Sequence, residues 1–239
     1  MDNPNIVEET DDYAVVFKPA KTHSEMLEKD VSNKTILEWF YKKKGFKKEI
    51  KLMHRLDFET NGLVLFAKNE KSYLFLKELQ DKGEFIKEYS AICVPSSGSI
   101  GLEGFPDNSF VPLCFSVSSS LIQSYFRPYG PGRKQVRPIV DIPKKHKEIA
   151  KDKGGFYQTE IIDVKDSKEN KVFTVRIKRG FRHQIRCHLC WAGFPILNDP
   201  LYSNAEAQPA GLLALRSHAL LFADPASGEK RECRIAALE

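Results

Sequence analysis

The chain has 239 residues and a net charge of +5, with 41% hydrophobic and 29% charged residues, which is typical of a globular protein with a substantial core. Its longest apolar runs, residues 62–67 and 219–223, are far shorter than the roughly 20 residues of a membrane span, and the acidic N-terminal residues lack the features of a secretory signal. We therefore expect a single domain over residues 1–239, located in the cytoplasm and not in a membrane.

Hydrophobic periodicity predicts five elements in the first half of the chain. The Lys18-Pro19-Ala20 turn ends the first strand, and Thr35 or Asn33 stands where the first helix needs an N-cap. Strands are expected at residues 13–17, 62–68 and 87–94, and helices at residues 35–44 and 70–82.

The second half begins with a less regular stretch. Residues 95–155 are rich in Pro, Gly and Ser and predict a variable basic segment, with at least one strand near residues 121–127. Further strands are expected at residues 156–164, 171–178, 213–223 and 232–236, and a helix at residues 184–192. Because strands dominate and helices do not alternate strictly with them, an α+β fold is favoured over a doubly wound parallel sheet.

Positive charge is concentrated in two stretches. Residues 127–153 hold nine basic residues against three acidic ones, a net charge of +6, and residues 42–51 hold six lysines. Such stretches suit a polyanion, and Phe126 and Tyr129 are placed to stack on bases, although lysine-rich surfaces are often merely solvated. The candidate RNA-binding surface consists of Arg127, Arg133, Lys134, Arg137, Lys144 and Lys145.

The five cysteines are odd in number and scattered, so we expect reduced thiols. Cys187 and Cys190 form a CxxC, but a zinc site needs two more ligands and the sequence has no second pair. Buried structural thiols are favoured over a metal or redox pair.

The most informative run is HRLDFETNGLVLFAK, residues 54–68. It places Asp57 in a polar loop, close to an imidazole and a guanidinium and just before a buried strand that would hold it rigidly. A carboxylate in this setting can attack or stabilise an anomeric carbon, as in glycoside hydrolysis. From the residues alone, an aspartate that only caps a turn is the alternative.

This run resembles the signature of the RluA-type pseudouridine synthases, and four further blocks resemble the same family in the same order. They are residues 8–20 (its opening strand and KPA turn), 87–92 (its KxYxA block), 180–202 (its HQIR, GxPI and DPLY blocks) and 213–225 (its closing leucine strand). The resemblance implies a pseudouridine synthase-type catalytic domain, with a mixed, mainly antiparallel sheet and a central cleft flanked by helices and loops.

The resemblance also implies roles for individual residues. Asp57 acts on the target ribose by covalent attack or by assisting loss of the C2′ proton, and Arg186 pairs with Asp57 and keeps it ionised. Tyr89 packs against the target base and helps to remove the C5 proton once the new bond exists; because a phenol with a pKa of about 10 is a poor base at neutral pH, stacking is expected to be its larger role. Arg55 enters the RNA stack as the uridine leaves it. Further substrate-binding residues are His54, Thr60, Arg182, His183 and Gln184, with Ile185 and Leu215 as an apolar wall.

The implied chemistry needs neither a metal nor a redox cofactor, and His54 and His183 are interpreted as hydrogen-bonding scaffold residues. The expected partner is ribosomal or transfer RNA, bound by a monomer without an obligate protein partner and without an N-terminal S4-type RNA-binding domain. The chain departs from the usual family residues at a few positions, which puts the RNA target in doubt rather than the reaction. These are Asn61 for Ser, Phe181 for Thr, Asn198 for Gly, and Arg216-Ser217 for His-Ala.

Two other functions remain open. One is a catalytically silent RNA-binding protein of the same fold. The other is a nucleoside or glycoside hydrolase that uses Asp57 with a second acid, either Glu59 or Asp199.

Overall fold

The computed structural model describes residues 3–25, 35–45, 49–95, 103–107, 120–140, 156–202 and 211–239. The chain divides into two compact units. The first comprises Met1–Tyr89 and Leu215–Ala237, and the second comprises Ser90–Ala214 and Leu238–Glu239. The expectation of a single catalytic domain with a central cleft stays a prediction.

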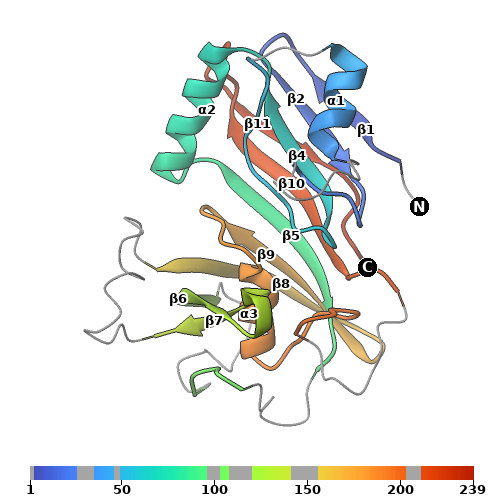
Figure 1. Ribbon diagram of the computed structural model, residues 1–239, viewed down its shortest axis with the longest axis vertical. Coiled ribbons are helices and arrows are strands. Elements are labelled where there is room, and N and C mark those ends of the chain that lie inside the picture. The colour runs from blue at the N-terminus through green and yellow to red at the C-terminus, as the bar shows by residue number, and fades with distance from the viewer. Residues whose placement is uncertain are drawn as a thin grey trace. The chain divides into compact units, whose positions relative to one another are not determined.

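The first unit is a sheet with two helices (Figure 1). Its strands are β1 (Asn5–Glu9), β2 (Tyr13–Lys18), β3 (Lys51–Leu52), β4 (Asn61–Ala67), β10 (Leu215–Ala223), β11 (Lys230–Arg234) and the start of β5 (Ile86–Cys93), and its helices are α1 (Ile36–Lys44) and α2 (Glu70–Lys82). The strand order is β1-β2-β4-β10-β5, with β3 paired to β4 and β11 to β10. β4 and β10 run parallel, whereas β2 is antiparallel to both β1 and β4.

Strand β4 is buried along its whole length because side chains pack on both of its faces. Leu63 and Leu65 belong to the same core cluster as Leu76 of α2. Phe66 points to the other face and stacks on Phe40 of α1, with ring centroids 4.4 Å apart. A strand covered on both faces is apolar without alternation, which is the pattern of this strand in the sequence.

Both helices of the first unit begin at capping side chains. Thr35 accepts a hydrogen bond from the Glu38 N–H at 3.1 Å. Asn69 and Ser72 form a capping box at the start of α2, which ends at Gly83 in the left-handed conformation. The predicted helix boundaries are therefore confirmed by local hydrogen bonds.

The second unit is an antiparallel sheet that packs one helix. Its elements are the end of β5, β6 (Ser120–Tyr129), β7 (Gln135–Ile139), β8 (Tyr157–Ser167), β9 (Asn170–Ile177) and α3 (Gln184–Trp191), with a short 3-10 turn at Pro131–Arg133. The strand order is β5-β9-β8-β6-β7. Helix α3 packs against β7 and β8, and all of its residues are buried.

The predicted α+β class is confirmed, and every strand and helix expected from the sequence is present. Strands β1, β3 and β7 were not predicted. β3 is only two residues long, β1 mixes acidic and apolar residues, and β7 contains Pro138 within the irregular basic segment. None of these shows the alternation by which a strand is recognised.

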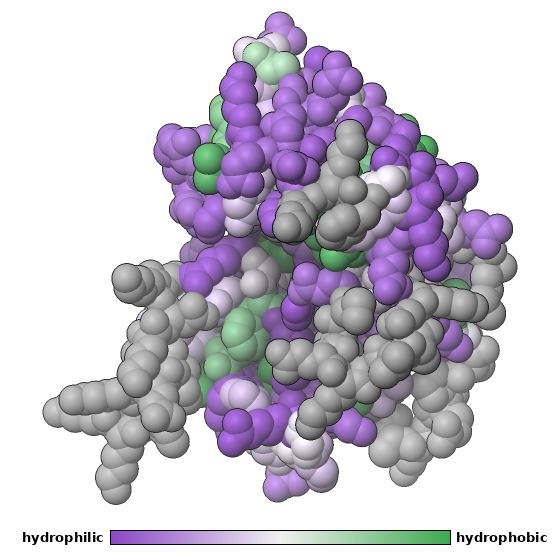
Figure 2. All heavy atoms as spheres, turned by 45° about the horizontal axis from the view of Figure 1, so that its top comes forward, coloured by the Kyte–Doolittle hydropathy of each residue, from purple (hydrophilic) through white to green (hydrophobic). Residues whose placement is uncertain are grey.

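The described surface is mostly hydrophilic. Figure 2 shows hydrophilic side chains over much of the visible described surface, with hydrophobic ones in scattered patches. Within the described parts of the chain, no helix is long and apolar enough to cross a membrane. Large hydrophobic side chains are nevertheless exposed at Val7, Phe58, Leu74, Val94, Leu121, Phe156 and Leu212. Among them, Phe58 directly follows Asp57 in the chain.

Candidate active site

Asp57 lies on a short loop that leads into strand β4. The Thr60 N–H donates to the Asp57 carbonyl at 3.1 Å and closes a turn. Leu56 is buried in the core, whereas Asp57 is only half-buried. The loop is therefore anchored on one side of Asp57 while the aspartate itself remains accessible.

The residues that follow strand β2, from Lys21 to Ser24, hold this loop. From the sequence, only the Lys18-Pro19-Ala20 turn that ends the strand was predicted here. The buried Ser24 hydroxyl donates to the Leu56 carbonyl at 2.9 Å and accepts from the Leu56 N–H at 3.0 Å. The Lys21 N–H donates to the Phe58 carbonyl at 2.8 Å. These contacts fix the backbone on both sides of Asp57, which is the support that a positioned catalytic group needs.

Lys18 is a buried cation near Asp57. Its side chain is fully buried, and Nζ donates to the carbonyls of Pro19 at 2.9 Å and Thr22 at 2.7 Å. Burial lowers the pKa of Lys18 to about 7, and the negative charges of Asp57 and Glu59 oppose this shift. The Lys18 amine therefore lies within electrostatic reach of the candidate catalytic carboxylate. The sequence showed the Lys-Pro turn but gave no signal that the lysine would be buried there.

Tyr89, at the end of the first unit, is also buried. Burial raises the pKa of its phenol, and the negative charge of Asp57 raises it further. Tyr89 therefore keeps its proton at neutral pH. Two of the three predicted catalytic residues, Asp57 and Tyr89, thus lie in one unit and influence each other electrostatically.

His54 is half-buried, with both ring nitrogens in the interior. Both ring nitrogens are buried and have no hydrogen-bond partner in the described part of the chain, and the ring meets Phe85 edge-on at 5.4 Å. Burial holds the pKa of His54 well below its usual range, and the nearby Lys87 acts in the same direction. The predicted hydrogen-bonding role is therefore wrong for His54, whose ring packs on an aromatic side chain.

The other substrate-binding candidates of this unit differ in exposure. The Arg55 side chain is 64% exposed, and its Nη1 lies 2.7 Å from Glu25. Thr60 and Leu215 are buried. Arg55 is thus open to solvent, whereas Thr60 and Leu215 lie in the interior, and substrate binding by these three residues stays a prediction.

In the second unit, Arg186 and Asp199 form a buried ion pair. Arg186 Nε and Nη2 each lie 2.8 Å from an oxygen of Asp199, and both side chains are almost fully buried. Asp199 Oδ1 also accepts from the N–H groups of Leu201 at 2.9 Å and Tyr202 at 3.1 Å. Sequence reasoning did not anticipate this partner for Arg186, and the pair of Arg186 with Asp57 stays a prediction.

The three residues around the start of α3 are held by internal contacts. His183 has a φ of 57°, and its Nδ1 lies 3.2 Å from the Tyr202 hydroxyl, so the predicted scaffold hydrogen bond is present. The buried Gln184 accepts from the Phe181 N–H at 2.9 Å and donates to a carbonyl of β8 at 2.8 Å. Ile185 is buried as well. These contacts brace the helix, and substrate binding by Gln184 and Ile185 stays a prediction.

Residues 12–191 match the sequence profile of the family described as RNA pseudouridylate synthase. The chain belongs to this family. The resemblance to RluA-type enzymes is thereby confirmed, and the enzyme class is that of an isomerase, an RNA pseudouridine synthase.

Individual relatives agree with this assignment. An uncharacterized RNA pseudouridine synthase of Zymomonas mobilis is 26% identical over 75% of this chain and 69% of its own length. The ribosomal large subunit pseudouridine synthase D of Buchnera aphidicola is 26% identical over 65% of this chain. The matched region covers only 39% of the length of that relative. Among solved structures, human RNA pseudouridylate synthase domain containing 1 shares the fold, with a TM-score of 0.68 over 98% of this chain and 83% of its own, at 17% identity.

Several departures from the usual residues of the pseudouridine synthase family have structural explanations. Arg216 Nε donates to Asn61 Oδ1 at 2.8 Å, so two of the departures are hydrogen-bonded to each other. Asn198 has a φ of 60°, a conformation that Asn tolerates better than most residues other than Gly. Phe181 stacks on Phe126, with ring planes 8° apart.

The candidate RNA-binding surface is exposed in part. Arg133 and Lys134 are exposed and Arg127 is half-buried. The exposed Arg182 donates from Nη2 to the Arg133 carbonyl at 2.6 Å, which ties it to the same loop. RNA binding by these residues stays a prediction. The remaining members Lys144 and Lys145 lie outside the described residues.

Arg137 does not belong to this surface. It is 4% exposed, its Nε donates to the Glu103 carbonyl at 2.8 Å, and its guanidinium lies 4.2 Å from the centre of the Tyr129 ring. The prediction that Arg137 binds RNA at the surface is therefore wrong. Its position on β7 turns it inward, where backbone oxygens and aromatic rings satisfy the charge.

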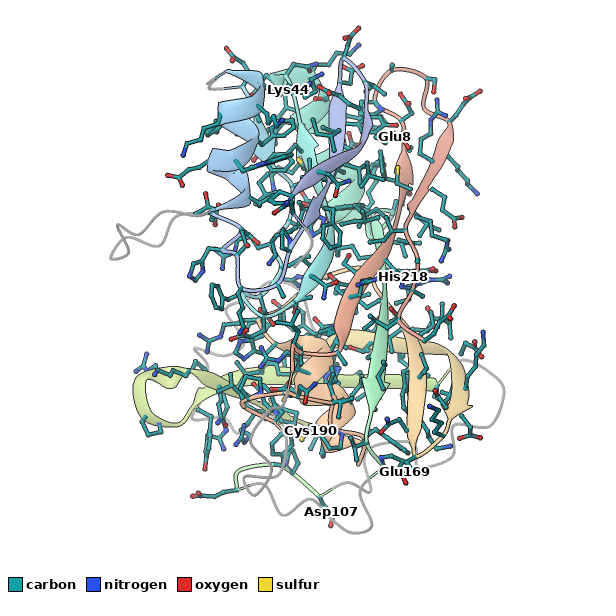
Figure 3. All side chains as sticks on the ribbon, turned by 90° about the vertical axis from the view of Figure 1, so that its right-hand side faces the viewer. Glu8, Lys44, Asp107, Glu169, Cys190 and His218 are labelled. Carbon is teal, nitrogen blue, oxygen red and sulfur yellow. The ribbon has the colours of Figure 1, made fainter. Side chains whose placement is uncertain are left out.

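The cysteines of the CxxC are buried and reduced. Cys187 donates to the Val136 carbonyl at 3.5 Å and Cys190, labelled in Figure 3, donates to the Tyr202 carbonyl at 3.1 Å. Burial raises the pKa of both thiols, which disfavours the thiolate that metal binding or redox exchange requires. The predicted structural role is confirmed for this pair.

Proposed function

We propose that this pseudouridine synthase isomerises specific uridines in ribosomal or transfer RNA through a step that depends on Asp57. The observation that carries the proposal is the held loop: hydrogen bonds fix the backbone on both sides of an accessible aspartate, beside a buried ammonium and a buried phenol. The naming of the Buchnera relative for the ribosomal large subunit supports a ribosomal target.

The proposed isomerisation leaves the atomic composition of the RNA unchanged. The bond between the ribose C1′ and uracil N1 breaks, the uracil turns within the site, C5 bonds to C1′, and the C5 proton moves to N1. Asp57 assists by attacking the ribose or by removing the C2′ proton, and either route requires it to be ionised when the reaction begins. A negative charge is suited to stabilising the positive charge that develops on the sugar.

The raised pKa of Tyr89 supports a packing role. A phenol that holds its proton more tightly than usual is a weaker acceptor for the C5 proton at neutral pH, while its ring still offers a flat apolar surface to the uracil. We propose Arg186 as the cation that keeps Asp57 ionised; within the second unit, two hydrogen bonds to Asp199 hold its guanidinium.

The hydrolase alternative is not favoured. The Asp199 carboxylate is buried and accepts hydrogen bonds from Arg186 and from two backbone N–H groups. Both of its oxygens are therefore already engaged in structural hydrogen bonds. Glu59, two residues after Asp57 in the chain, lies within electrostatic reach of Lys18.

The test is the Asp57→Asn variant, compared with the wild type and with Asp81→Asn, which changes an exposed aspartate on α2. RNA from cells with and without the gene is treated with a pseudouridine-specific label, and the missing sites are mapped. We expect wild-type protein and the Asp81 variant to restore the missing sites and Asp57→Asn to bind RNA without restoring them. An active Asp57→Asn variant, or release of free uracil, would contradict the proposal.

A further inference from the structure

An exposed pair of rings stands next to Asp57. The rings of His23 and Phe58 have centroids 4.5 Å apart and planes 36° apart. Phe58 is 39% exposed although it directly follows Asp57, and His23 is half-buried. The two rings thus contact each other while Phe58 remains open to solvent.

The backbone that carries this pair is held by hydrogen bonds. The Phe58 carbonyl accepts from the Lys21 N–H at 2.8 Å, and the His23 carbonyl accepts from the Ile36 N–H at 2.9 Å, at the start of α1. A ring that is already in place loses little conformational freedom when a ligand stacks on it. The pair is therefore a prepared surface rather than a mobile side chain.

Two exposed cations lie close to the ring pair along the chain. Lys21 is exposed on the same segment as His23, and Arg55, whose exposed guanidinium pairs with Glu25, lies three residues before Phe58. Flat aromatic surfaces with neighbouring cations are the combination by which proteins bind unpaired nucleotides, with the base on the ring and the phosphate near the charge.

A protein partner is less well matched to this surface. The other exposed large hydrophobic side chains in the described part of the first unit are Val7 on β1 and Leu74 on α2, and Phe58 lies on neither element. A stable protein interface buries about 800 Å² on each partner. A single supported ring offers far less apolar area than that, but it matches one base.

We propose that Phe58, supported by His23, stacks on an unpaired base adjacent to the target uridine. This inference rests on the proposed function, because it takes the Asp57 loop as the place where the uridine reacts. It also specifies the substrate class. The uridine must lie in a loop, bulge or single strand whose neighbouring base can leave its own stack.

The kinetic test compares Phe58→Leu, which keeps an apolar side chain without a ring, with Phe58→Tyr, which keeps the ring. Leu74→Ala is the control for loss of an exposed apolar side chain in the same unit. RNA from cells that lack the gene is the substrate. We expect Phe58→Leu to lower kcat/KM by about 5- to 150-fold, the range for losing one stacked base, while Phe58→Tyr and Leu74→Ala stay within about twofold of wild type.

A spectroscopic readout separates stacking from a merely structural role. The probe is an oligoribonucleotide with 2-aminopurine next to a uridine, whose fluorescence is quenched when the base stacks on an aromatic ring. We expect wild type and Phe58→Tyr to quench the fluorescence and Phe58→Leu not to quench it. The circular dichroism spectrum of Phe58→Leu should be unchanged, which shows that the variant is folded. Equal quenching and equal kcat/KM for wild type and Phe58→Leu would overturn the inference, as would capture of a protein at this surface with unchanged RNA kinetics. An inactive wild type would instead contradict the proposed function.

Discussion

Removing the carboxylate of Asp199 tests how the second unit holds Arg186. In Asp199→Ala the guanidinium loses two charge-assisted hydrogen bonds of 2.8 Å, and the N–H groups of Leu201 and Tyr202 lose their acceptor. Arg186 is 1% exposed, so water cannot readily replace the lost partner. Removing one member of a buried ion pair costs about 3–5 kcal/mol. We expect the free energy of unfolding to fall by that amount.

The assay is urea unfolding followed by circular dichroism, with the midpoint and slope fitted separately. The control is Asp166→Ala in the same unit, where the partner Lys171 and the aspartate lie at the surface and the aspartate side chain is 82% exposed. That surface pair is expected to contribute at most about 1 kcal/mol. A loss below about 1 kcal/mol for Asp199→Ala at an unchanged slope would refute the reasoning, since it would mean that the guanidinium is satisfied without Asp199.

Two more perturbations concern the first unit and the buried histidines. A Cβ on Gly62, which has a φ of 125°, would lie 2.2 Å from the Ser217 carbonyl oxygen, so we expect Gly62→Ala to lower the free energy of unfolding by about 1–3 kcal/mol or more. Gly45→Ala, with nothing within 4 Å of its Cβ and a φ of 78°, is the control for backbone strain alone, and equal urea midpoints for the two variants would contradict the steric argument. Burial lowers the pKa of His188 to about 3 and that of His54 well below 6.5, so the unfolded chain binds more protons below pH 6.5 and stability falls as the pH falls. The expected slope approaches about 1.4 kcal/mol per pH unit for each histidine as the pH falls well below 6.5, measured by urea unfolding between about pH 7 and 5, and a flat profile would show that these rings are not held neutral.

Elements with strong local patterns could be predicted from the sequence. The helix expected at residues 70–82 is present as α2 (Glu70–Lys82). It could be predicted because its apolar spacing and its N-cap Asn69 both lie within a short stretch of sequence. Strand β4 could be predicted equally well from its run of apolar residues. Short strands such as β3 were not, because pairing with a distant strand, rather than an alternating pattern, makes them strands.

The candidate site was predictable only where a local run marked it. Asp57 stands out because its loop precedes a buried strand, and the resemblance to a known family singled out Tyr89. Ser24 and Lys18 were missed. Ser24 is 32 residues from Leu56, the residue that it holds, and nothing near it in the chain indicates that contact.

The sequence by itself determined the elements with strong local patterns, the α+β class, and which aspartate is the candidate for chemistry, since each depends on neighbours along the chain. Only the tertiary structure decided where each charge lies and what satisfies it. Arg137, expected on the surface, is buried against Tyr129, and Arg186 is paired with Asp199. Burial and ion pairing depend on side chains that folding brings together from distant positions, so a count of charges along the chain cannot assign them.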